Sequence, residues 1–154
     1  MKADLVTYLA CTKVGTEAEF QRLKALYEEP GRAYHNWTHI ELMLALLDSV
    51  RQSVGAWDVV AMAVFYHDAI YKPRSATNEE DSAQLLLDTL GEYEETIRAA
   101  EYIRATKHHS PTQDHDLQLL LDADLLILAS GAQGYATYVR QVREEYSFAS
   151  DEQW

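Results

Sequence analysis

The chain has few of the residues that cross-link a fold or interrupt its helices. Its 154 residues include a single cysteine, Cys11, together with three prolines and six glycines. One cysteine excludes an internal disulfide and a structural zinc site built from several thiolates, and it favours a reducing compartment. The small number of glycines and prolines argues against a many-turned β fold. We therefore expect a helical, cytoplasmic protein.

Basic residues and long apolar segments are also scarce. Lys and Arg number 13 against 25 Asp and Glu, which gives a formal net charge of -12. A field of this sign repels nucleic-acid duplexes and anionic membranes. Residues 1–10 lack the apolar segment of a signal peptide, and no apolar run approaches the ~20 residues needed to span a bilayer. We expect neither a nucleic-acid duplex nor a membrane as a partner.

Apolar residues at helical spacing predict one all-α domain over residues 1–154, a compact bundle of about six to seven helices. The segment 57–67 is apolar nearly all round and is predicted to be the buried central helix. In the helix over 92–107, the residues expected to face inward are Ile97, Ala100, Ile103 and Ala105. The expected helices cover about 16–27, 36–54, 57–67, 77–90, 92–107, 116–128 and 135–146, with a short further helix over 1–10.

The pair His67-Asp68 follows the apolar run 59–66, where a helix is expected to end. An imidazole nitrogen beside a carboxylate oxygen is a ligand pair that borderline divalent metals prefer. A helix can also end in His beside a capping Asp without binding any metal. The pair could thus supply two ligands of a metal site, and the remaining ligands must come from elsewhere in the chain.

Two other stretches offer suitable ligands. His35 and His39 are spaced i and i+4, so on a helix they share one face, although such a pair can also simply hydrogen-bond within a core. Asp124 lies in the apolar run 119–128, where a carboxylate is costly to bury without a cation or several donors. Asp122 raises the same question, and residues spaced i and i+2 cannot both face one cleft. One of these two carboxylates should lie at the site.

Read together, these residues resemble the HD-domain superfamily of metal-dependent phosphohydrolases. Residues 34–39, Tyr-His-Asn-Trp-Thr-His, look like the YHNxxH signature of cyclic-nucleotide phosphodiesterases. Over about residues 27–146 the chain is similar to a smaller group of predicted HD-superfamily phosphohydrolases. The stretches that carry this similarity are 27–36, 67–71, 78–83, 106–109 and 122–125.

The resemblance implies a divalent metal ion, chosen from Mn, Fe, Co, Ni, Zn and Mg. The ligands that it implies are His39, His67, Asp68 and Asp124, with His35, His109 and Asp122 as alternates. It further implies that His35 is a general acid.

The resemblance also extends to residues around these ligands. It makes Glu79 a base or water-holding residue and Arg143 a cation for the transferred phosphoryl group. A solvated surface position explains each of the cations equally well, and helix capping explains Asn78. Candidate substrate-binding residues are Tyr34, Tyr71, Lys72, Asn78 and Lys107.

The expected function is hydrolysis of a small phosphorylated substrate, with a nucleotide favoured. Two alternatives stay open: a di-iron oxygenase, which needs His108 or His109 as a ligand of a second metal, and a non-catalytic metal-containing sensor. A homodimer is expected only from the general frequency of two-fold assemblies. The polar ending over 147–154, where relatives are expected to continue into a further helix, leaves open a shortened form or a more open cleft.

Overall fold

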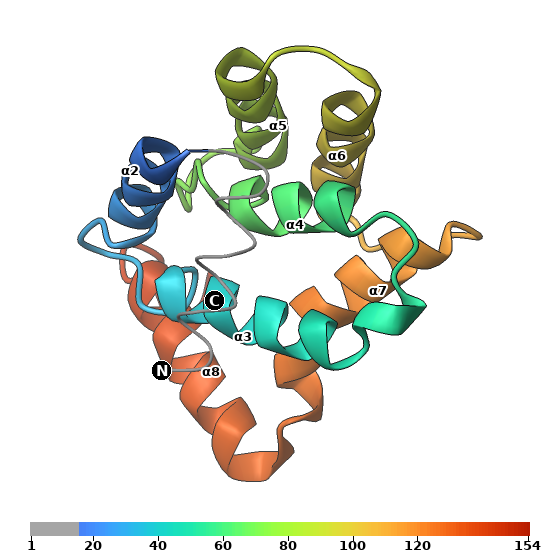
Figure 1. Cartoon of the computed structure of the whole chain (residues 1–154). Helices are drawn as coiled ribbons and strands as arrows, with labels where there is room; N and C mark the ends of the chain where they lie inside the picture. The colour runs from blue at the N-terminus through green and yellow to red at the C-terminus, as the bar shows by residue number, and fades with distance from the viewer. Residues whose placement is uncertain (1–15) are drawn as a thin grey trace.

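The computed structural model describes residues 16–154 and confirms the predicted all-α bundle. The described residues form seven α-helices and two short 3-10 helices, η1 (Arg51–Ser53) and η2 (Leu126–Ala129). They contain no β-strand (Figure 1). No helix in this part of the chain combines the length and the apolar character that a membrane span needs. The helix predicted over 1–10 lies outside the described residues. The α-helices are α2 (Glu17–Tyr27), α3 (Trp37–Ser49), α4 (Trp57–Tyr66), α5 (Asn78–Leu90), α6 (Glu94–Ala105), α7 (His115–Asp124) and α8 (Gly131–Glu145).

Helix α4 is the centre of the bundle, as its apolar sequence predicts. Every residue of α4 except Asp58 is buried, and the helix contacts α3, α5, α6 and α7 (Figure 1). A helix that is apolar all round can bury every face only when other helices surround it. Because α4 ends at Tyr66, the next two residues, His67 and Asp68, emerge inside the bundle.

Side-chain caps place the two upstream histidines differently. The Asn36 side chain accepts a hydrogen bond from the Thr38 backbone N–H at 3.0 Å and begins α3. His35 therefore precedes the helix, whereas His39 lies in its first turn. The two rings remain neighbours, with centroids 6.3 Å apart, but they do not share a helix face as the spacing suggested.

Three helix boundaries and one buried face differ from the sequence prediction. Helix α3 ends at Ser49 and is followed by η1, α7 ends at Asp124 and is followed by η2, and α8 begins at Gly131. Apolar periodicity does not distinguish a continuing α-helix from a tighter 3-10 turn, so it extended both helices too far. Ile97 is 44 % exposed, because the buried face of α6 runs through Ala99, Ala100 and Ile103.

Asp116 on α7 fixes the beginning of α4. Its two carboxylate oxygens accept hydrogen bonds from the backbone N–H groups of Gly55 and Ala56, each at 2.8 Å. Ala56, at the N-cap position, has no side chain that could satisfy these donors itself. A carboxylate at this end also complements the positive pole of the helix dipole. Asp116 thus links the helix that carries Asp124 to the helix that precedes His67.

Replacing this cap tests its contribution to stability. We expect Asp116→Ala to lower the free energy of unfolding by about 1–2 kcal/mol, because two helix-terminal donors lose their acceptor. Asp116→Asn should cost less, since its amide oxygen still accepts a bond. The matched control is Asp122→Ala, at an exposed position on the same helix, which should change stability by less than about 0.5 kcal/mol. Denaturant unfolding of the three variants measures these differences, and equal loss in the control would contradict the capping role.

Candidate metal centre

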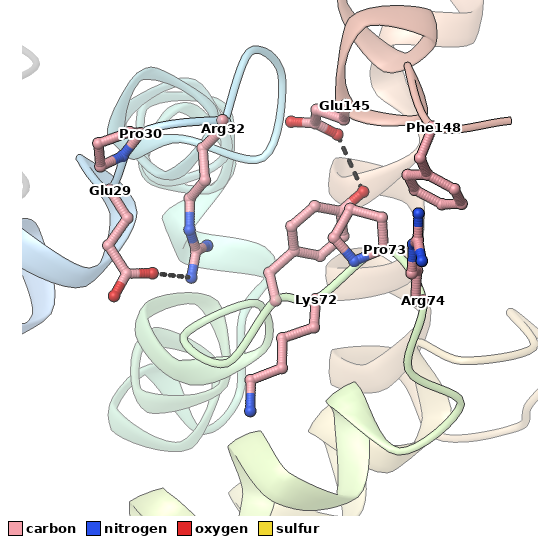
Figure 2. A pocket seen from close by; sticks show the side chains of 10 residues that line it. Glu29, Pro30, Arg32, Lys72, Pro73, Arg74, Glu145 and Phe148 are labelled. Atoms are coloured by element: carbon pink, nitrogen blue, oxygen red, sulfur yellow. Dashed lines mark hydrogen bonds and ion pairs between the residues drawn. The ribbon is translucent and has the colours of Figure 1, made fainter.

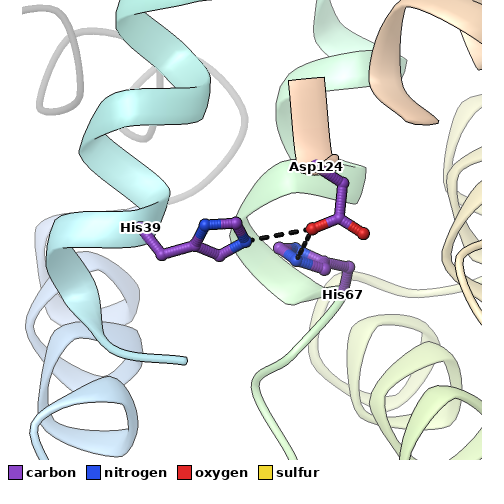
Figure 3. Close-up of side chains that lie close together, drawn as sticks. All are labelled: His39, His67 and Asp124. Carbon is purple, nitrogen blue, oxygen red and sulfur yellow. Dashed lines mark hydrogen bonds and ion pairs between the residues drawn. The ribbon is translucent and has the colours of Figure 1, made fainter. Parts of the chain in front are cut away.

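Three side chains from three different helices bring their ligand atoms together. His39 comes from the first turn of α3, His67 follows α4, and Asp124 is the last residue of α7 (Figure 3). All three ligand atoms lie within 4.8 Å of one another, so this group could hold a metal ion. Asp124 Oδ1 is 3.0 Å from His39 Nε2 and 3.4 Å from His67 Nε2. We call these three residues the triad.

The hydrogen bonding of His67 shows which of its nitrogens is available to a metal. Its Nδ1 lies 2.9 Å from the carbonyl oxygen of Val64, and a carbonyl can only accept, so Nδ1 carries a hydrogen. Its Nε2 is buried without a hydrogen-bond partner among the described residues, although two carboxylate oxygens lie close by. These are Asp68 Oδ2 at 3.1 Å and Asp124 Oδ1 at 3.4 Å. A lone pair facing two carboxylates is favourable only with a cation between them, and imidazole and carboxylate are suitable donors for a divalent metal.

The pKa shifts of His67 and Asp124 also show that a positive charge between the carboxylates is favourable. Burial would raise the pKa of Asp124, but the neighbouring imidazoles of His109, His39 and His67 hold it well below its ordinary value. Burial would lower the pKa of His67, but the carboxylates of Asp68 and Asp124 raise it well above its ordinary value. Without a metal, a proton on His67 supplies the charge between the carboxylates. Metal and proton therefore compete for the same nitrogen.

Asp68 and His109 lie at the edge of the triad. Asp68 contacts His67 but is not one of the three residues whose ligand atoms are all mutually close. His109 Nε2 is 2.7 Å from Asp124 Oδ2, the oxygen that faces away from His39 and His67. The backbone of His109 is in the left-handed region (φ 47°), the one non-glycine residue of the described range with a positive φ. Such a conformation costs energy and persists where the surroundings hold it, here with His109 orienting a triad carboxylate.

Glu145 is a site residue that the sequence analysis missed. This last residue of α8 is buried, and its Oε1 accepts hydrogen bonds from the backbone N–H groups of Tyr34 (2.7 Å) and His35 (2.9 Å). Its Oε2 lies 2.6 Å from His35 Nδ1 and accepts a bond from the Tyr71 hydroxyl at 2.9 Å. The sequence offered one signal for its burial: Glu145 shares a helix face with Tyr138 and Val142, at spacings of i, i+4 and i+7.

The partners of His35 fix its orientation and its charge. The Tyr71 ring stacks on the His35 imidazole, with centroids 4.2 Å apart and planes inclined by 25°. Burial would lower the pKa of His35, but the hydrogen bond to Glu145 and nearby carboxylates raise it above its ordinary value. Burial would raise the pKa of Glu145, and the bond from His35 lowers it. The contact with Glu145 thus favours the protonated form of His35 and occupies Nδ1, so that Nε2 is the nitrogen available to another partner.

Other predicted residues lie away from the triad. The Arg143 guanidinium donates to the backbone carbonyls of Tyr146 (2.8 Å) and Ala149 (3.0 Å) and pairs with Asp151 at 2.9 Å, so it holds the C-terminal segment. Asp122 is exposed, which leaves Asp124 as the carboxylate that α7 contributes.

The predicted residues around α5 make local contacts. The Asn78 side chain accepts a bond from the Lys72 backbone N–H at 3.0 Å and donates to its carbonyl at 2.9 Å, which closes the loop before α5. Lys107 donates to the Ala76 carbonyl and lies 4.0 Å from Glu79. These contacts join two loops and do not reach the triad.

Two adjoining cavities open beside the triad. One, of about 160 Å³, is lined by both His35 and Asp124 and by His109. The other, of about 390 Å³, reaches His39 and is mostly apolar, with Leu42 and Met43 in its wall. Tyr34 and Ile127 line both cavities. A ligand could therefore contact the triad and His35 while its apolar part lies against α3 and η2.

No family model matches the chain, and neither a curated protein nor a solved structure matches it. The chemistry of the site therefore rests on its own geometry.

Metal binding is the direct test of the triad. We expect the wild type to hold about one divalent ion per chain at the triad and Asp124→Asn to lose it, because the amide removes the charge that balances the ion. His109→Ala should weaken metal binding by about 10- to 100-fold through loss of an orienting hydrogen bond. Elemental analysis and calorimetric titration with Mn²⁺ and Zn²⁺ measure both effects. Asp122→Ala is the control, and an ion retained in Asp124→Asn would show that the triad is not its site.

Proposed function

We propose that the chain is a metal-dependent phosphohydrolase of the HD-domain type, which cleaves a phosphoester or phosphoanhydride bond of a small substrate. The observation that carries this proposal is the buried Nε2 of His67, which has no hydrogen bond within residues 16–154 and faces the carboxylates of Asp68 and Asp124. His39, His67 and Asp124 would hold the ion, with Asp68 beside them. This ligand set agrees with the resemblance of residues 34–39, 67–68 and 122–125 to that superfamily.

A divalent ion at the triad supplies Lewis-acid chemistry, lowering the pKa of a water and polarising a phosphoryl oxygen. The protein's own part is to place the substrate and to handle the proton. The attacking water would release one proton to solvent, and its oxygen would form a new bond to phosphorus as the bond from phosphorus to the leaving oxygen breaks. His35 donates its Nε2 proton to that leaving oxygen, while Glu145 at Nδ1 keeps the ring charged and oriented.

The cavities support a substrate with both a phosphate and an apolar or aromatic part. The smaller cavity is lined by both His35 and Asp124, so a phosphoryl group bound there could contact both residues. The larger cavity continues from His39 along Leu42, Met43 and Ile127, side chains that suit a nucleobase better than a second charged group. A nucleotide therefore remains the favoured substrate.

The contacts of His109 favour a single ion over the di-iron alternative. Its Nε2 lies 2.7 Å from a triad carboxylate, and it is not one of the mutually close ligand atoms. His108, the other candidate for a second ion, is exposed. A cytoplasmic location and a homodimer remain predictions.

The proposal is tested by phosphate release from a panel of nucleotide mono-, di- and triphosphates and cyclic nucleotides. We expect the Mn²⁺-loaded wild type to hydrolyse at least one, and His35→Ala to lose about 10²- to 10⁴-fold in rate while it keeps the ion. The ion content of His35→Ala must be measured beside its rate, because a variant that loses the ion would lose activity for that reason alone. Ion binding without turnover of any phosphorylated compound would overturn the proposed reaction and favour the sensor.

The raised pKa of His35 predicts the pH dependence of that reaction. A general acid must be protonated, so activity should fall as pH rises through the folded-state pKa of His35, which lies above the ordinary value. Glu145→Gln removes the charge that raises this pKa and should move the alkaline limb of the pH–rate profile to lower pH. Its amide oxygen can still accept bonds from the backbone at 34 and 35. The control is Glu144→Gln, at the exposed neighbouring position, which should leave the profile unchanged.

A further inference from the structure

A third cavity, distinct from the two beside the triad, lies behind the residues that hold His35. It measures about 370 Å³. Tyr71 and Glu145, which both contact His35, line it. No triad residue lines it. We call it the rear pocket; its other lining residues are Glu29, Pro30, Gly31, Arg32, Lys72, Pro73, Arg74 and Phe148.

Three cations line the rear pocket of a chain whose net charge is -12. Arg74 is exposed and lies over the Phe148 ring, with its guanidinium carbon 4.3 Å from the ring centroid. The Lys72 side chain is also exposed and makes no ion pair within the described residues. Figure 2 shows Arg74 against Phe148 and Lys72 extending from the neighbouring part of the loop. Both charges are therefore available to a ligand.

Arg32 adds a third positive charge to the lining of the rear pocket, and its only ion-pair partner among residues 16–154 is Glu29. Its guanidinium donates to three backbone carbonyls, those of His35 (3.1 Å), Asp68 (2.7 Å) and Ala69 (2.8 Å). Carbonyl oxygens satisfy the donors but carry no net charge, and Arg32 Nε is buried with no acceptor among residues 16–154. The carboxylate nearest to Arg32, that of Glu29, is half-exposed and 3.6 Å away.

The two acidic side chains of the rear pocket do not balance its three basic side chains. Glu145 directs its two oxygens to His35, Tyr71 and the backbone of Tyr34, and it makes no ion pair with Arg32, Lys72 or Arg74. Glu29 is the other carboxylate, and it lies beside Arg32. Within residues 16–154, neither Lys72 nor Arg74 forms an ion pair with a carboxylate. In a strongly acidic chain this excess favours binding of an anion.

We propose that the rear pocket is a second binding site for a phosphate group of a small metabolite, held by Lys72 and Arg74. The choice of phosphate rests on the proposed function, whereas the preference for an anion rests on the charges alone. Phe148 keeps Arg74 in place, and the flexible stem of Lys72 lets its ammonium follow the ligand. The rigid rings of Pro30, Pro73 and Tyr71 bound the space left for the rest of the molecule. An occupant of this site would contact the groups that orient His35 without touching the triad.

The test is calorimetric titration of the full chain with inorganic phosphate and with AMP, before and after treatment with EDTA. Chelation removes binding to a metal ion, so binding that persists reports the rear pocket. We expect one site per chain to persist, with affinity reduced about tenfold by Lys72→Ala and about tenfold by Arg74→Ala. Both side chains are exposed, so neither variant should disturb the fold.

Arg140→Ala is the matched control, because it removes the same charge from an exposed position on α8. It should bind as the wild type does. Absence of metal-independent binding, or equal weakening by Arg140→Ala, would overturn the site. Because the readout needs neither ion nor turnover, a chain that binds phosphate here yet hydrolyses nothing would count against the proposed reaction alone.

Discussion

The arrangement of the site depends on burying carboxylates in an acidic chain. Asp124 and Asp68 approach one another around His67 in a region shielded from water, where unbalanced negative charge is costly. Three imidazoles, from His39, His67 and His109, surround the Asp124 carboxylate and lower its pKa. The helices bring these groups together: α3 carries His39 in its first turn, α4 ends one residue before His67, and α7 ends at Asp124.

A second buried carboxylate organises the neighbouring part of the molecule. Glu145 binds the backbone before α3, the imidazole of His35 and the hydroxyl of Tyr71, and thus joins three segments far apart in the sequence. The His35 imidazole lowers the pKa of Glu145, as the surrounding imidazoles lower the pKa of Asp124. The two centres lie next to each other but have separate partners, so the proposed reaction could use one to bind an ion and the other to donate a proton.

The rigid part of this design is α4. Its burial on all faces fixes its position, Asp116 caps its beginning, and the Nδ1 bond from His67 to Val64 orients the ring at its end. His67 therefore has little freedom, as a residue that must present one nitrogen to an ion requires. By contrast, Lys72 and Arg74 lie on the exposed loop that follows, where side chains can adapt to a ligand.

The sequence by itself determined the helical class and the buried central helix, because these follow from local periodicity. It also placed His39, His67 and Asp124 among the candidate ligands. Only the tertiary structure decided between Asp124 and Asp122, separated His35 from the triad, and directed Arg143 to the C-terminal segment. The same holds for Glu145, whose four hydrogen bonds reach residues up to 111 positions away. Such choices depend on which side chains packing brings together, and spacing along the chain carries little information about contacts across that distance.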